Sequence, residues 1–199
     1  LLLAFIAYQL VATLRGSPEG IGVVTTVRVW FVVSSLANIA WIYAWHYERV
    51  LLSVVFMLVL LASLIAIYLK LQIGMAPSTS VRRWLVEVPF GVYLGWITVA
   101  TVANVTALLV DVNWGGFGVS EAFWAAIMIV VATVVGVVML ARTGDIAYVL
   151  VLIWALFGVF MKRIATDPRE PIVIGAAALC GIVLIGAVGF RLVRGVAGG

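Results

Sequence analysis

Residues 50–69 read VLLSVVFMLVLLASLIAIYL, a run of 20 residues without a charge that lies between Arg49 and Lys70. A helix of about 20 residues is about 30 Å long, which matches the hydrocarbon core of a bilayer. Further charge-free runs fill most of the chain; they are residues 29–47, 88–110, 122–141, 146–161 and 171–190, with residues 1–14 as the end of another. The pattern predicts an all-α fold, a polytopic transmembrane helical bundle with about seven membrane helices.

The composition supports the same class of protein. Hydrophobic residues make up 66% of the chain and charged residues 10%, whereas soluble domains have about 45–50% and about 25%. The net charge of +4 comes from basic residues at the ends of the runs, where they contact lipid headgroups, so we expect membrane lipids and no nucleic acid as partners. The run 146–161 is short, and its helix spans the bilayer only if Lys162 and Arg163 extend toward the headgroups.

The basic residues are unequally divided between the two ends of the predicted helices. One side has eight, Arg15, Arg28, Lys70, Arg82, Arg83, Arg142, Arg191 and Arg194, and the other has four, Arg49, Lys162, Arg163 and Arg169. The positive-inside rule makes the first side cytoplasmic. We therefore expect an integral protein of the bacterial cytoplasmic membrane with a cytoplasmic C-terminus. The loop 111–120 would lie outside, with Ser120 as the N-cap of the next helix.

Two predicted helices each place polar and aromatic residues on one face. These residues are Ser34, Asn38, Trp41 and Trp45 on the first helix, and Pro89, Tyr93, Trp96, Ala100 and Asn104 on the second. A face of this kind is costly to expose to lipid, so both faces are expected to point into the bundle. The two asparagines fit interhelical hydrogen bonds, and the whole set also fits a pocket for a planar hydrophobic ligand.

Other polar residues indicate no enzyme. His46 is the one histidine, and without a cluster of ligands it favours an interfacial position over a metal site, with axial ligation of a bound tetrapyrrole metal as the weaker alternative. Glu87 could pair with Arg83 one turn earlier. Paired carboxylates within a span, a Ser/His/Asp set, HExxH and a phosphate-binding glycine loop are all missing from the sequence, which predicts a non-enzymatic protein.

The same two faces resemble helices of a known family. The segment VPFGVYLGW at 88–96, followed by ATVAN at 100–104, is similar to the Pro-Tyr-Leu-x-Trp and Ala-Thr-x-x-Asn motifs of the tryptophan-rich sensory protein and translocator protein family. The segment LANIAW at 36–41 resembles that family's Leu-Asn-x-x-Trp motif. The resemblance implies a helical bundle that binds tetrapyrroles, sterols or similar flat lipophiles. It carries over a set of ligand-binding candidates, Asn38, Trp41, Tyr93, Trp96, Ala100 and Asn104.

The resemblance also divides the chain. Residues 1–110 match the family's second to fifth helices, so the first family helix would precede residue 1, and residues 111–199 add three membrane helices. We expect a non-enzymatic membrane protein that binds or carries a flat hydrophobic ligand, a tetrapyrrole in one possibility. The alternatives are an accessory subunit of a larger pigment-containing membrane complex, and a facilitative transporter. Further copies of the chain or other membrane subunits are candidate partners.

Overall fold

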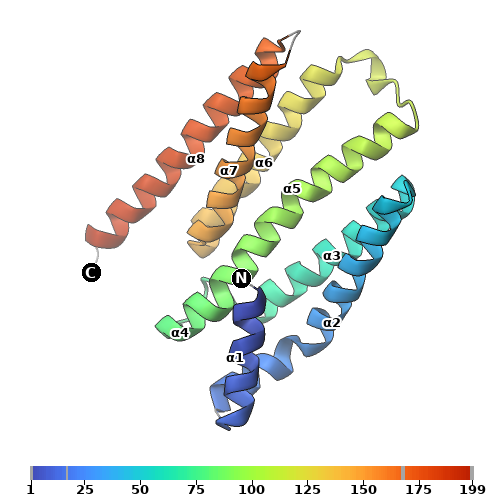
Figure 1. Cartoon of the computed structure of the whole chain (residues 1–199). Helices are drawn as coiled ribbons and strands as arrows, with labels where there is room; N and C mark the ends of the chain where they lie inside the picture. Colours follow the sequence, from blue (N-terminus) through green and yellow to red (C-terminus); the bar gives the residue numbers. More distant parts are fainter. Residues whose placement is uncertain (1, 17, 167–168, 198–199) are drawn as a thin grey trace. The chain divides into compact units, whose positions relative to one another are not determined.

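The computed structural model describes residues 2–16, 18–166 and 169–197 as helices joined by short loops (Figure 1). The long helices are α2 (Pro18–His46), α3 (Val50–Lys70), α5 (Val88–Asp111), α6 (Glu121–Thr143), α7 (Ile146–Ala165) and α8 (Pro171–Ala197). The short ones are α1 (Leu2–Leu14), α4 (Ser80–Arg82), the π-helix η1 (Arg83–Glu87) and the 3-10 helix η2 (Gly116–Gly118). No strand occurs among the described residues, so the predicted all-α fold is confirmed.

Six helical stretches in the described part of the chain are long and apolar enough to cross a membrane. The stretch Ser80–Asp111 joins α4, η1 and α5 into one of them. Helix α1 has 13 residues and is about 20 Å long, shorter than a bilayer core. Of the seven membrane helices that the sequence predicted, six have spanning length in the structure, and the seventh corresponds to the shorter α1. Helix α7 reaches 20 residues because it continues past Lys162 and Arg163 to Ala165.

Local side-chain and backbone contacts set the helix ends. The Ser120 hydroxyl accepts a hydrogen bond from the Phe123 backbone N–H at 3.3 Å, so the predicted N-cap of α6 is confirmed. Asp145 caps α7 in the same way, because its carboxylate accepts from the Tyr148 N–H at 3.1 Å. Between them Gly144 ends α6 with a φ of 67°, a left-handed conformation that glycine adopts at little cost. These contacts satisfy backbone groups that a helix leaves unpaired at its ends.

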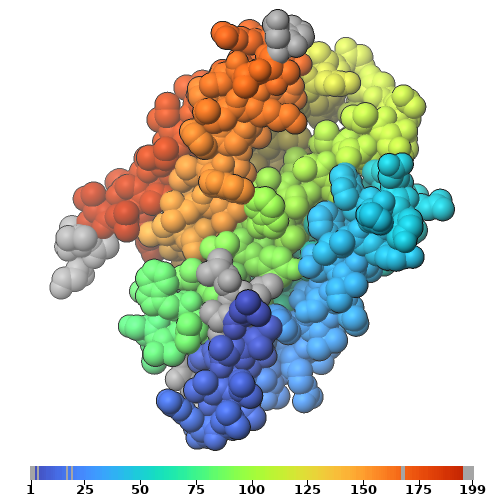
Figure 2. Space-filling view, viewed as in Figure 1, coloured from blue at the N-terminus to red at the C-terminus, as the bar shows by residue number. Residues whose placement is uncertain are grey.

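The chain forms two compact units, Leu1–Val112 and Asn113–Gly199. In the first unit α3 packs against both α2 and α5, while α1 pairs with α2 and also touches α5 and η1. Figure 2 shows the side chains of α1 and α2 side by side on one face of the molecule. Phe5 packs edge to face against two other rings, with centroid distances of 5.3 Å to Phe31 and 4.8 Å to Phe90. This aromatic cluster joins α1, α2 and α5.

In the second unit α6, α7 and α8 all pack against one another. Gly136 of α6 lies at their crossing, since a Cβ atom there would be 2.7 Å from Leu152 Cδ1 of α7 and 3.2 Å from Leu184 Cδ2 of α8. Membrane helices have little hydrophobic drive to associate, so close approach at small residues is a main source of their packing energy. Gly136 supplies that close approach in this unit.

Candidate functional site

The α2 face contains a polar atom that is buried without a partner. Ser34 is 1% exposed and donates to the Phe31 carbonyl of its own helix at 2.8 Å, whereas Asn38 and Trp41 are half-buried. The Trp41 Nε1 is buried and has no hydrogen-bond acceptor among the described residues. The Trp41 ring stacks on Trp45, with centroids 6.4 Å apart. A buried donor without an acceptor is unfavourable, so the Trp41 N–H stands out among the polar groups of this helix.

The α5 face is divided between exposed and buried positions. Tyr93 and Ala100 are half-buried, and Trp96 is 46% exposed at the helix surface. Asn104 is 3% exposed, and its Oδ1 accepts a hydrogen bond from Ser53 Oγ of α3 at 2.9 Å. The Ser53 hydroxyl also lies 2.7 Å from the Val50 carbonyl of its own helix, so its one proton is shared between two acceptors. Asn104 thus links two helices.

The candidates from α2 and α5 meet different neighbours. The ring contact of Trp41 is with Trp45 on its own helix, and the amide contact of Asn104 is with Ser53 on α3. Ser53 was not among the predicted site residues. A serine within the most apolar run is a sequence signal, but Ser63 lies in the same run, and it is the hydrogen bond to Asn104 that distinguishes Ser53. Helix α3, which packs on both α2 and α5, is therefore part of any site that these residues form.

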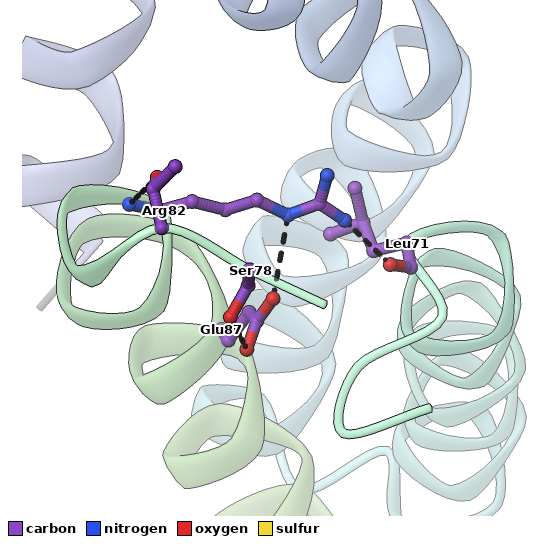
Figure 3. Close-up of polar contacts among 5 residues, drawn as sticks. Leu71, Ser78, Arg82 and Glu87 are labelled. Atoms are coloured by element: carbon purple, nitrogen blue, oxygen red, sulfur yellow. Dashed lines mark hydrogen bonds and ion pairs between the residues drawn. The ribbon is translucent and has the colours of Figure 1, made fainter. Parts of the chain in front are cut away.

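A second polar group lies at the start of α5 (Figure 3). Glu87 is 7% exposed, and its Oε1 lies 3.3 Å from Arg82 Nε in an ion pair that lacks hydrogen-bond geometry. Ser78 donates to Glu87 Oε2 at 3.2 Å, and Arg82 Nη2 donates to the Leu71 carbonyl at the end of α3 at 2.7 Å. The group ties the connection after α3 to the beginning of α5.

The predicted pairing of Glu87 with Arg83 is wrong, because the structure pairs Glu87 with Arg82. The cause is the π-helix η1 over Arg83–Glu87. In an α-helix, residues five apart point in different directions, while the wider π turn, with its i to i+5 hydrogen bonds, brings them onto one side. Arg83 is exposed instead.

His46 lies at the end of a helix of membrane-spanning length, and its position at the membrane interface stays a prediction. His46 is exposed at the last residue of α2, where its ring lies edge to face with Tyr47 at 5.1 Å. Among the described residues no three histidine, cysteine, aspartate or glutamate side chains form a group that could hold a metal ion.

Fold and site together define a class, a polytopic α-helical membrane protein with polar groups between its helices. Within that class the chain matches a family model, TSPO-like protein, over residues 1–190, and it belongs to this family. The match extends past residue 110, where the sequence motifs ended, into the second unit. No curated protein matches the chain, and no solved structure does either.

Proposed function

We propose that this TSPO-like protein binds a flat hydrophobic ligand, of the tetrapyrrole or sterol kind, without chemical conversion. The observation that supports the proposal best is the Trp41 indole N–H, which is buried and lacks an acceptor among the described residues. A carboxylate or carbonyl at the edge of a planar ligand would satisfy that donor. Asn38, one turn earlier and half-buried on the same helix, adds an amide that can donate and accept.

The other candidates supply apolar and aromatic surface in this proposal. Trp96 and Tyr93 present rings on α5, and Ala100 adds a small apolar side chain one turn after Trp96. Aromatic contacts contribute about 0.5–1.5 kcal/mol each beyond the burial of area. Asn104 takes a supporting part, since its oxygen accepts from Ser53 and holds α5 against α3.

The test compares porphyrin affinity among variants, measured from the absorbance of the porphyrin so that lost tryptophan fluorescence does not interfere. Trp41→Phe keeps an aromatic ring and removes the N–H, and we expect about three- to tenfold weaker binding, as for loss of one hydrogen bond. Trp96→Ala should weaken binding by roughly tenfold or more, because stacking and burial are both lost. Trp154→Phe, at a 61% exposed position of α7, is the matched control and should bind as the unchanged protein does.

Equal porphyrin affinity in Trp41→Phe and Trp154→Phe would contradict the assignment of Trp41 as a ligand donor. Absence of saturable binding of both a porphyrin and a sterol to the purified protein would contradict the proposed ligand class. In that case the residues of the α2 and α5 faces would act only in helix packing. This is the role that they would have in an accessory subunit of a membrane complex.

A further inference from the structure

The connection between α5 and α6 presents an aromatic side chain at its tip. Phe117 is 85% exposed, although phenylalanine is usually buried. It lies within η2 with a φ of 54°, in the left-handed region that bulky residues rarely adopt. An unfavourable backbone conformation that displays a large apolar side chain indicates a function for that side chain.

The connection is folded around Phe117. The Trp124 Nε1 of α6 donates to the Gly116 carbonyl at 2.9 Å. The Trp114 ring packs against both Phe117 and Trp124, with centroid distances of 5.3 Å in each case. Gly116 and Gly118, on either side of Phe117, have φ values of 60° and 78°, which suit glycine. The outward position of Phe117 therefore results from a braced loop.

The position of the loop in the chain identifies what Phe117 meets. It lies between Asp111 at the end of α5 and Glu121 at the start of α6, and both helices are of membrane-spanning length. Phe123, the third residue of α6, is also 50% exposed. Tryptophan and tyrosine rings next to the ends of spanning helices concentrate at the boundary between headgroups and acyl chains, and Trp114 in this loop packs directly on Phe117.

We propose that Phe117, braced by Trp114 and Trp124, inserts into the headgroup and acyl boundary of the bilayer and sets the depth of the connection between α5 and α6. Lipid removes the apolar ring from water, which offsets the cost of its backbone conformation. The partner is the lipid surface itself.

The experiment places one spin label at a time on the full chain in phospholipid vesicles. The one natural cysteine is first removed as Cys180→Ala, and labels are then attached in Phe117→Cys, in Ile182→Cys as the lipid reference and in Thr166→Cys as the aqueous reference. Ile182 is 66% exposed on α8, and Thr166 is exposed just after α7. Collision rates with oxygen, which concentrates in lipid, are compared with those of a water-soluble nickel chelate.

The proposal expects the oxygen-to-nickel ratio at residue 117 to be closer to that at 182 than to that at 166. A ratio at 117 equal to that at 166 would mean that a side chain at this position faces water, which overturns the proposal. Low collision rates with both reagents at 117 would mean that the ring is covered by protein, a second copy or another subunit, and would overturn it as well.

Discussion

Ser53 of α3 donates a hydrogen bond to the Asn104 side chain of α5 across 2.9 Å, and both residues are almost fully buried. The bond links two helices that pack against each other. It explains why an asparagine is found within a membrane span, where an unpaired amide would be costly.

Loss of this bond should destabilise the bundle measurably. Ser53→Ala leaves the Asn104 oxygen buried without its donor, and we expect a decrease of about 0.6 kcal/mol in the free energy of unfolding, with about 1.7 kcal/mol as the upper end for such bonds. Unfolding by detergent titration in mixed micelles measures the change. Ser35→Ala is the control, because Ser35 is exposed and bonds only to the Phe31 carbonyl of its own helix. Equal effects of the two substitutions would contradict an interhelical role for Ser53.

The ion pair at the start of α5 should depend on Arg82. Arg82→Ala removes the charged partner of Glu87 and the hydrogen bond from Arg82 Nη2 to the Leu71 carbonyl. A hydrogen bond that involves a charged group contributes about 1.5–3 kcal/mol, so a decrease of that order in unfolding free energy is expected. Arg83→Ala changes an exposed side chain and should have little effect. Since Arg82→Ala also removes the Nη2 hydrogen bond to the Leu71 carbonyl, the part of its effect that disappears in a Glu87→Gln background is the part due to the ion pair across the five-residue spacing of η1. A larger effect at Arg83 would show that this turn has ordinary α-helical spacing.

Gly136→Val should destabilise the second unit. Its Cβ position is 2.7 Å from Leu152 Cδ1 and 3.2 Å from Leu184 Cδ2, so the new side chain requires these two buried leucines to shift, at a cost of about 1–3 kcal/mol. Gly158→Val of α7 has open space around the Cβ position and serves as the control. Thermal unfolding followed by circular dichroism should show a lower midpoint for the first variant alone. An unchanged midpoint for Gly136→Val would mean that the helices repack without loss.

The unequal distribution of basic residues, eight against four, predicts the orientation of the chain. In a Cys180→Ala background, Ser80→Cys should be protected from a membrane-impermeant maleimide added outside cells, and Gly115→Cys should react. Gly115 suits the substitution, because its surroundings are open and its φ is −74°. Reaction of both cysteines from the same side would refute the predicted topology.

Much of the fold follows from local properties of the chain. The apolar runs predicted where the long helices lie, because length and hydrophobicity alone decide whether a segment can span a bilayer. The Ser120 cap was predictable for a similar reason, since a cap and its helix are neighbours in sequence. The Asn38 and Asn104 faces were identified because a polar residue in an apolar run is conspicuous.

The partners of those residues needed the tertiary structure. Glu87 pairs with Arg82 and not with Arg83, because the π turn changes the angular spacing of side chains around the helix. No short sequence motif predicted that turn. Ser53 was identified as the partner of Asn104 once the register of α3 against α5 was known. The meeting of Phe5, Phe31 and Phe90 depends likewise on how three helices interlock. Hydrophobicity is a property of each segment alone and determines that it becomes a membrane helix. The contacts between helices depend on the fit of side chains far apart in the chain, which only the folded structure decides.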